Sequence, residues 1–362
     1  MNVSIHGLGL ALPEHGLSQA QARALAGTYA GLDQRPRALD VLYRQTRIMN
    51  RNSVVVENSG VAAMPFFPPP VPGNESGPGT ASRMQRYAGE VVPLAARACR
   101  EALSTPDISA GDITHLVVVT CTGFFAPGLD VALIGELGLD RSASRFQLGF
   151  MGCHGALNGL QLSASIVNGD SAARVLLCAA ELCSLHMQYG SGTDQAVSNS
   201  LFADGAAAAV LGAESPGGKH LARLNSFCSH LVPDSADAMS WRIGDHGFQM
   251  TLSARVPQLI EENLPGWIER WLAKSGLKTP DVAAWCVHPG GPRILDAVEK
   301  SLKLPASALS ASREILAAHG NMSSPTVLFI LDKLRKTHGQ IPHPCVMLGF
   351  GPGLVIEAAL LA

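Results

Sequence analysis

Short apolar runs alternate with amphipathic segments along most of this chain, and this alternation limits the possible folds more than any other feature. Each run is too short and too uniformly apolar for a free-standing helix, so it predicts a buried β-strand. The segments between them carry apolar residues at helical spacing. In the first half, the predicted strands are 3–10, 115–121, 145–148, 173–180 and 206–211, and the predicted helices are 83–103, 131–137 and 156–167. Such a pattern predicts a layered α/β fold whose sheets are covered on both faces.

The second half repeats this order of elements without an obvious repeat of residues. Its predicted strands are 221–230, 283–287, 345–349 and 354–360, and its predicted helices are 256–275, 292–302 and 326–335. Turn-forming residues at 214–218 predict a boundary between two halves, 1–214 and 215–362. The segment 65–79 is rich in Pro, Gly, Asn and Ser, which predicts an irregular surface excursion: a flap, a dimer arm or a plain linker.

Composition excludes several classes of partner. Hydrophobic residues make up 47% of the chain and the formal net charge is −2, so neither nucleic acid nor an anionic membrane is the expected main partner. The eight cysteines include no CxxC pair, and several lie in apolar runs, which predicts reduced thiols in a cytoplasmic protein rather than disulfides or a metal site. We expect no secretory signal and no stable membrane insertion, because no long uninterrupted apolar run is present.

One cysteine lies in a setting suited to nucleophilic chemistry. Cys153 is surrounded by small and apolar residues, after a predicted strand and before a predicted helix. By composition alone it is a small buried hydrophobe. Its position suggests another interpretation, because backbone N–H groups and the field at a helix N-terminus stabilise a thiolate.

Two polar residues downstream fit the same chemistry. His288 stands at the end of a predicted strand, directly before Pro-Gly-Gly, and is either a core histidine or a base that holds Cys153 as thiolate. Asn321 lies between Gly320 and Met322 and is either a turn residue or a neutral donor to a developing oxyanion. A thiol, an imidazole and a carboxamide together favour carbon–carbon bond formation on thioesters.

Five motifs in order resemble one enzyme family. They are the cysteine run at 150–156, FADGAAA at 202–208, HPGG at 288–291, GNMSS at 320–324 and GFGPG at 349–353. This set resembles the type III polyketide synthases, the chalcone-synthase-like group of the thiolase superfamily. The resemblance implies a five-layer αβαβα thiolase fold, with the nucleophilic cysteine in the first half and the His and Asn in the second. It also implies a homodimer in which an element near 124–127 helps to close the neighbour's cavity.

The resemblance also implies roles for individual residues. Cys153 would take a starter acyl group from coenzyme A, and His288 and Asn321 would bind the carbonyl of malonyl-CoA as it loses CO2. Phe202 would be one of two gatekeeping aromatics between the coenzyme A tunnel and the elongation cavity. The loop of Gly349, Phe350, Gly351, Pro352 and Gly353 would line that cavity. Acyl-CoA and malonyl-CoA would be the substrates, with no metal or redox cofactor.

Departures from the plant pattern lead to a more detailed hypothesis. Met250 stands at the second gatekeeping position, Trp241 stands where chalcone synthases have a small residue, and His154 follows the nucleophile with an unknown effect. The segment 121–128 resembles bacterial enzymes that make alkylpyrones and alkylresorcinols. The hypothesis is therefore that the enzyme loads a medium- or long-chain fatty acyl-CoA starter and releases an alkylpyrone or alkylresorcinol. A long starter is favoured because each buried CH2 contributes about 0.8 kcal/mol to its binding.

Coenzyme A phosphates require cations at the mouth of a tunnel. Arg44, Arg47, Arg51 and Arg293 are candidates, with Gly290 in the turn beside Arg293, and each arginine has the alternative interpretation of a solvated surface charge.

Other functions remain open. The alternatives are a ketoacyl carrier-protein synthase-like enzyme, a type III enzyme that makes a polyhydroxylated aromatic, a hydroxymethylglutaryl-CoA-synthase-like enzyme and a non-catalytic thiolase-fold subunit. The complete set of Cys153, His288 and Asn321 argues against a purely structural role.

Overall fold

The computed structural model describes residues 2–29, 36–58, 62–105, 108–190, 192–214 and 218–362. Within these residues, nine strands form one mixed sheet in the order β13-β14-β15-β10-β1-β9-β8-β6-β7. A short antiparallel pairing between β1 and β10 joins its two halves. The first half contains β1 (Val3–Ala11), β9 (Asp204–Ala213), β8 (Arg174–Leu182), β6 (His115–Thr120) and β7 (Ser144–Gly149). The second half contains β10 (Ala222–Leu231), β15 (Val355–Leu361), β14 (Cys345–Gly351) and β13 (Ala284–Val287).

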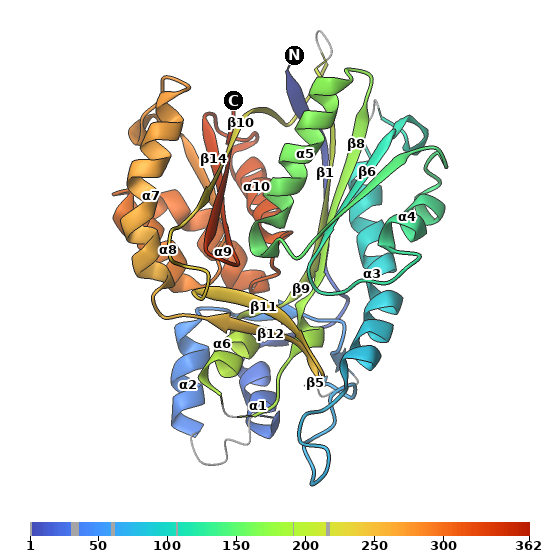
Figure 1. Ribbon diagram of the computed structural model, residues 1–362, viewed down its shortest axis with the longest axis vertical. Coiled ribbons are helices and arrows are strands. Elements are labelled where there is room, and N and C mark those ends of the chain that lie inside the picture. Colours follow the sequence, from blue (N-terminus) through green and yellow to red (C-terminus); the bar gives the residue numbers. More distant parts are fainter. Residues whose placement is uncertain (1, 30–35, 59–61, 106–107, 191, 215–217) are drawn as a thin grey trace.

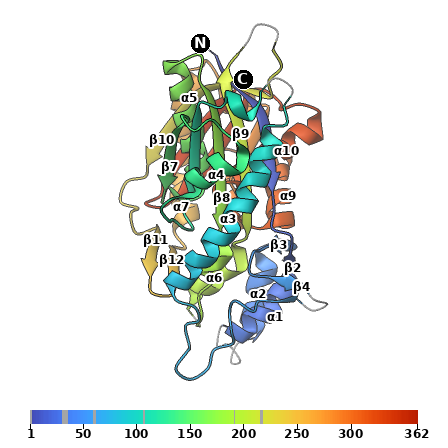
Figure 2. The same ribbon diagram turned by 90° about the vertical axis from the view of Figure 1, so that its right-hand side faces the viewer.

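Helices cover both faces of each half, as Figure 1 shows. The helices α5 (Gly155–Gly169) and α10 (Thr326–His338) lie between the two halves. The outer face of the first half is covered by α3 (Thr80–Ala102) and α4 (Leu129–Leu137), which lie in front in Figure 2. On the other side, α7 (Val256–Ala273) and α8 (Pro292–Ser301) cover the second half. The layers therefore follow the order αβαβα, which confirms the predicted fold class.

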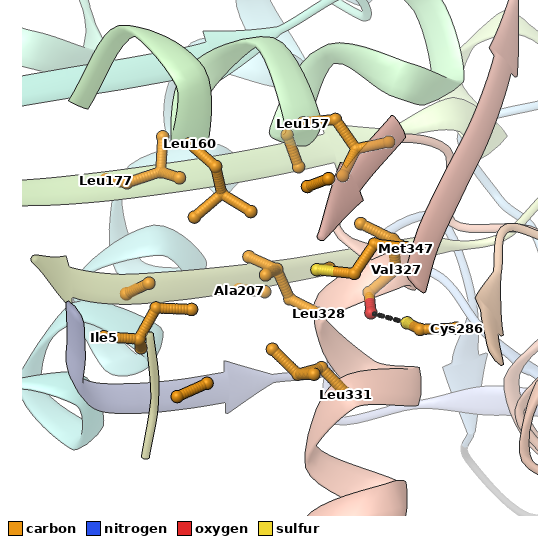
Figure 3. Packing of buried hydrophobic residues seen from close by; sticks show 14 of the residues in the cluster. Ile5, Leu157, Leu160, Leu177, Ala207, Cys286, Val327, Leu328, Leu331 and Met347 are labelled. Carbon is orange, nitrogen blue, oxygen red and sulfur yellow. Dashed lines mark hydrogen bonds between the residues drawn. The ribbon is translucent and has the colours of Figure 1, made fainter. Parts of the chain in front are cut away.

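The largest part of the core lies between the two sheet halves (Figure 3). Leu157 and Leu160 of α5 and Leu328 of α10 meet there, and all three are almost completely buried. The thiol of Cys286 on β13 donates to the carbonyl of Val327 on α10 at 3.1 Å, which ties this strand to the central helix. Two further apolar clusters lie beneath the outer helices. Because α5 and α10 are enclosed by apolar strands, their first turns are held rigidly relative to each other.

Smaller elements close the end of the molecule that is remote from both termini (Figure 1). They include a two-stranded hairpin, β11 (Met239–Gly244) and β12 (Gly247–Leu252). The others are β2 (Gly16–Ser18), α1 (Gln19–Tyr29), α2 (Pro36–Gln45), β3 (Asn50–Asn52), β4 (Glu57–Asn58), β5 (Ala62–Ala63) and α6 (Thr193–Leu201). A further helix, α9 (Ser310–His319), packs against α10 in the second half. The sequence patterns predicted none of these as regular elements.

The predicted strands and helices are otherwise present, with ends that differ by a few residues. The segment 65–79 is irregular, as predicted, and is tied down where the Arg83 side chain donates to the Pro78 carbonyl at 2.8 Å. The predicted boundary at 214–218 lies largely outside the described residues, so the division into two halves at that point stays a prediction. All eight cysteines lie in the described part of the chain and are free, and seven are buried. No helix in the described ranges is long and apolar enough to cross a membrane.

Candidate active site

Cys153 lies at a tight turn between a strand and a helix, as the sequence predicted. β7 ends at Gly149, a short 3-10 helix η2 (Gly152–His154) follows, and α5 begins at Gly155. Gly152 has a φ of 76°, and a Cβ there would come within 2.2 Å of Pro352. Glycine is therefore required at this position, and its absence of a side chain lets Pro352 pack directly on the turn that holds the nucleophile.

The Cys153 thiol is buried. The Ser323 hydroxyl lies 3.5 Å from its sulfur and is oriented to donate to it. Burial raises the pKa of the Cys153 thiol to about 11; the hydrogen bonds from Ser323 and Asn321 oppose this effect, and the nearby Glu181 carboxylate adds to it. Burial of the thiol therefore opposes ionisation, while the helix N-terminus favours it, and the resting thiolate stays a prediction.

Asn321 is fixed by hydrogen bonds at both ends of its carboxamide. Its side-chain N–H donates to the Gly290 carbonyl at 3.3 Å, and its side-chain oxygen accepts from the Ser323 N–H at 2.8 Å. The Asn321 carbonyl also accepts from the Ala203 N–H at 2.9 Å. Asn321, Gly290 and Cys153 line the same cavity. The structure thus brings the HPGG and GNMSS motifs to the nucleophile, although their catalytic roles stay predictions.

His288 follows β13, and its backbone N–H donates to the Leu348 carbonyl on β14 at 2.8 Å. Its side chain is fully buried, and neither ring nitrogen has a hydrogen-bond partner among the described residues. Burial lowers the pKa of His288 to about 3, and the neighbouring His154 contributes in the same direction. Burial therefore disfavours the protonated form of the imidazole. Buried polar atoms without partners are uncommon and costly, so these two nitrogens favour a site that a ligand completes.

The sequence did not single out Glu181, a buried carboxylate behind the nucleophile. Glu181 lies on β8 and accepts hydrogen bonds from the Cys121 N–H at 2.9 Å, the Thr122 hydroxyl at 2.7 Å and the Ser324 hydroxyl at 3.0 Å. Burial raises the pKa of Glu181 to about 7, and these hydrogen bonds limit the rise. A signal was present in the sequence, since Glu181 directly follows the apolar run from Val175 to Ala180 in β8.

A small cavity, which we call the nucleophile cavity, adjoins Cys153 in two neighbouring parts that share wall residues. Cys153, Phe202 and Met250 line both parts. Other predicted residues divide between them: Gly290 and Phe350 border the first, and Trp241 and Pro352 border the second.

Two glycines of the loop that was predicted to line the elongation cavity, Gly349 and Gly351, lie against His154. A Cβ on Gly349 would lie 2.9 Å from the Cβ of His154, and a Cβ on Gly351 would lie 2.3 Å from its ring. His154 itself is buried, and its Nδ1 is 2.6 Å from the side-chain oxygen of Asn158. His154 therefore packs the loop against α5, while Gly353, with a φ of 79°, forms the turn that follows β14.

Trp241 is a fixed wall of the nucleophile cavity. Its indole N–H donates to the Cys121 carbonyl at 2.8 Å, and its ring stands edge-on to His186 with centroids 5.3 Å apart. His186 in turn stacks on Phe248, and its Nδ1 accepts from the Phe248 N–H at 2.9 Å. These contacts hold the β11–β12 hairpin against the site, and the Trp241 side chain narrows the nucleophile cavity.

The predicted cationic residues separate into two groups. Arg44, Arg47 and Arg293 are exposed, and Arg47 forms a long ion pair of 3.7 Å with Asp296. Arg51 is only 8% exposed and donates to the carbonyls of Asn199 at 2.6 Å and Phe202 at 3.1 Å. Arg51 therefore holds the backbone at Phe202, and its contact with a coenzyme A phosphate stays a prediction.

Comparisons with known proteins agree with this geometry. The family model for chalcone and stilbene synthases, N-terminal domain, matches residues 4–215, and the model for the C-terminal domain matches residues 223–362. An alpha-pyrone synthesis polyketide synthase-like protein of Mycobacterium tuberculosis is 34% identical over 285 residues, which cover 77% of this chain and 72% of that protein. A probable polyketide synthase 1 of Dictyostelium discoideum is 35% identical over 280 residues, which cover 75% of this chain but only 9% of that much longer protein.

The crystal structure of PKS-I from the brown alga Ectocarpus siliculosus superimposes with a TM-score of 0.92 and 31% identity, covering 99% of this chain and 98% of that one. The matched regions include every motif at the nucleophile cavity. The chain therefore belongs to the chalcone and stilbene synthase family, and it is a type III polyketide synthase, an acyltransferase of the thiolase fold.

Proposed function

We propose that this synthase loads a medium- or long-chain fatty acyl group from acyl-CoA onto Cys153, extends it with malonyl-CoA and releases an alkylpyrone or alkylresorcinol. In loading, the Cys153 sulfur forms a thioester and free coenzyme A leaves. Malonyl-CoA then loses CO2, and its enolate attacks the Cys153 thioester. One carbon–carbon bond forms, the bond from sulfur to the acyl carbon breaks, and the chain lengthens by two carbons.

Asn321 and His288 are the proposed partners of the malonyl carbonyl. The Asn321 carboxamide is held by Gly290 and Ser323, so it does not need to reorganise when negative charge develops. A neutral His288 can donate one N–H to the same oxygen, and its ring nitrogens have no competing partner in the described part of the chain. Pre-organised donors in a site without water stabilise an enolate by several kcal/mol.

The small size of the nucleophile cavity is the observation that supports a short product. Trp241 forms part of its wall and is held there by its hydrogen bond to the Cys121 carbonyl. Such a space favours few condensations, hence a triketide or tetraketide. The name of the mycobacterial relative refers to alpha-pyrone synthesis, which agrees with this product class.

The remaining proposals concern the setting of the enzyme. Phe124 and Phe150 are 47% and 39% exposed beside the edge strand β7, and exposed aromatic groups of this kind favour burial in a homodimer. Arg44, Arg47 and Arg293 are the proposed contacts of coenzyme A phosphates. We further propose a cytoplasmic enzyme that needs no metal or organic cofactor, because decarboxylation drives the condensation.

The test is to incubate the protein with malonyl-CoA and acyl-CoA starters from C4 to C18, with Cys153→Ala as the control. Intact protein mass and small-molecule products are followed by mass spectrometry. We expect acylation of Cys153 and pyrone or resorcinol products whose yield rises with starter length. Equal kcat/KM for short and long starters would exclude the long-chain hypothesis, and activity with an acyl carrier protein alone would indicate a carrier-protein-dependent enzyme.

A further inference from the structure

Ser323 is a polar residue in direct contact with the nucleophile. Its hydroxyl lies 3.5 Å from the Cys153 sulfur and is oriented to donate to it. Both residues are buried, and both border the part of the nucleophile cavity that Trp241 also lines. The contact is therefore made away from bulk water, where a hydrogen bond to a charged group is strongest.

The backbone of Ser323 has an unusual conformation. Its φ is 58°, in the left-handed region that residues with a Cβ rarely adopt. Two hydrogen bonds hold it there: its N–H donates to the side-chain oxygen of Asn321 at 2.8 Å, and its carbonyl accepts from the Thr326 N–H at 3.1 Å. Strained residues that the surrounding structure holds in place cluster at active sites. The strain at Ser323 therefore favours a role for the position of its hydroxyl.

One chain of hydrogen bonds joins the nucleophile to the proposed malonyl site. The Ser323 hydroxyl donates to the Cys153 sulfur, the Ser323 N–H donates to the Asn321 side chain, and the Asn321 side chain donates to the Gly290 carbonyl. Ser323 thus uses its side chain toward the nucleophile and its backbone toward Asn321. A substitution that removes the side chain leaves the backbone N–H in place, so the two links can be separated by experiment.

The Cys153 sulfur needs hydrogen-bond donors when it carries a negative charge. Burial raises the pKa of its thiol to about 11, and the Glu181 carboxylate acts in the same direction. The hydrogen bonds from Ser323 and Asn321 oppose this rise. A hydroxyl that donates to a buried thiolate replaces part of the hydration that the sulfur has lost.

The other titratable groups of the site do not supply a firm positive charge. Burial raises the pKa of the Cys121 and Cys183 thiols, so both stay uncharged near neutral pH. Burial lowers the pKa of His154 and of His288, which disfavours their protonated forms. These groups come from the ends of β6 and β13, from η2 and from the 3-10 helix η3 (Cys183–His186), while Glu181 comes from β8. Neutral donors therefore carry much of the stabilisation of the thiolate.

We infer that Ser323 is a catalytic residue whose hydroxyl stabilises the Cys153 thiolate, both when it attacks the starter and when it leaves the extended chain. The two steps rest on the proposed function. In loading, Cys153 gives up its proton and its sulfur bonds to the acyl carbon. The bond from that carbon to the coenzyme A sulfur breaks, and the departing coenzyme A thiolate takes up a proton.

The same hydroxyl serves the condensation step. The enolate carbon bonds to the acyl carbon, the bond from that carbon to the Cys153 sulfur breaks, and Cys153 leaves as a thiolate. Negative charge is thus on the Cys153 sulfur at the start of loading and at the end of condensation. A donor that is already in place stabilises it in both steps without reorganisation.

The direct test is the pH dependence of Cys153 alkylation by iodoacetamide, which reacts with the thiolate. The modified peptide is quantified by mass spectrometry. Ser323→Gly removes the hydroxyl, and glycine adopts a φ of 58° without strain, so the fold is retained. The apparent pKa of Cys153 should rise by about one unit, which lowers the alkylation rate about tenfold at pH values below it. An unchanged or lower pKa in folded Ser323→Gly would overturn the inference.

The neighbouring Ser324→Ala is the matched control. The Ser324 hydroxyl is also buried, but it donates to Glu181 at 3.0 Å and not to the nucleophile. Its removal should therefore not raise the apparent pKa of Cys153. A rise as large as that in Ser323→Gly would mean that any lost hydroxyl in this turn has the same effect, which contradicts a specific role for Ser323.

A comparison of two rates separates catalysis from structural support. Ser323→Gly keeps the N–H that donates to Asn321, so decarboxylation of malonyl-CoA without a starter should stay within about threefold of wild type, while acylation of Cys153 at pH 7 should slow about tenfold. Equal losses in both rates would show that Ser323 only supports the turn, and the inference would be wrong.

The alkylation assay needs no acyl-CoA, so the two proposals fail separately. If no acyl-CoA acylates wild-type Cys153 but Ser323→Gly raises its pKa, the proposed function is wrong and Ser323 still stabilises the thiolate. If the wild type loads and extends a starter but Ser323→Gly leaves the alkylation profile unchanged, only the role of Ser323 is wrong.

Discussion

The substitution Glu181→Gln should change stability in a pH-dependent way. The free energy of unfolding of the variant minus that of wild type should be larger at neutral and alkaline pH than at acidic pH. Glu181 is fully buried, and its carboxyl group accepts hydrogen bonds from Cys121, Thr122 and Ser324. Glutamine keeps the shape and one acceptor oxygen of the side chain, and the two hydroxyls can accept from its amide. The change therefore removes the ionisable proton with little loss of packing.

The size of the effect follows from the pKa of Glu181. Burial raises this pKa to about 7, from 4.5 for an unperturbed glutamate. Between these two values the folded protein keeps a proton that the unfolded chain has lost, so the wild type loses stability as pH rises through this window. One pKa unit corresponds to about 1.4 kcal/mol, and the total loss is therefore about 3 kcal/mol by pH 7. Glu181→Gln has no ionisable proton at this position, so it does not show this loss of stability.

The assay is urea unfolding of both proteins at several pH values from 4.5 to 8. The free energy of unfolding of Glu181→Gln minus that of wild type should rise by about 3 kcal/mol across the range, because contributions from other titrating groups cancel in the difference. The exposed Glu14→Gln removes a carboxylate at the surface and serves as the matched control. A difference that stays constant with pH would refute the argument that Glu181 is buried with a raised pKa.

Three further substitutions test the site. Asn321→Ala should slow malonyl-CoA decarboxylation about 100-fold, the usual cost of losing one oxyanion donor, while acylation of Cys153 measured by intact mass changes little. Trp241→Ala should enlarge the nucleophile cavity and give products heavier by one or more two-carbon units in mass spectrometry; an unchanged product would mean that Trp241 does not limit extension. Arg51→Met should lower the free energy of unfolding in urea by about 3 kcal/mol, because two buried carbonyls lose a charged donor, and a loss under 1 kcal/mol would contradict this.

The sequence predicted the layers of the fold because the elements that form them have strong patterns. β6, β8 and β14 are buried on both faces, so they read as continuous apolar runs. α1 and α6 have weaker patterns than α3 and α8. α2 has a strongly amphipathic pattern that the sequence interpretation passed over. The hairpin β11–β12 carries exposed polar residues in both strands, so periodicity could not separate it from loop.

The sequence indicated which residues meet at the site but not how deeply they are buried. Motifs at the ends of strands place Cys153, Gly290 and Asn321 around one cavity, as the sequence indicated. Burial is a property of the assembled fold, so the sequence could not indicate that it raises the pKa of the Cys153 thiol. Arg51 and Glu181 illustrate the same limit, since an isolated charge in a sequence does not reveal whether it is solvated or enclosed.

The two central helices help to explain how a buried thiol can serve this chemistry. α5 begins at Gly155, two residues after Cys153, and α10 begins at Thr326, two residues after Ser324, so both helix N-termini lie close to the site. The field of a helix N-terminus stabilises a negative charge by at most about 2 kcal/mol. Burial acts in the opposite direction and raises the pKa of the Cys153 thiol from 9 to about 11. In the proposed reaction, the helix fields stabilise the negative charge that develops when the thiol attacks and when an enolate forms beside Asn321, and interactions that strengthen in the transition state are the ones that accelerate a reaction.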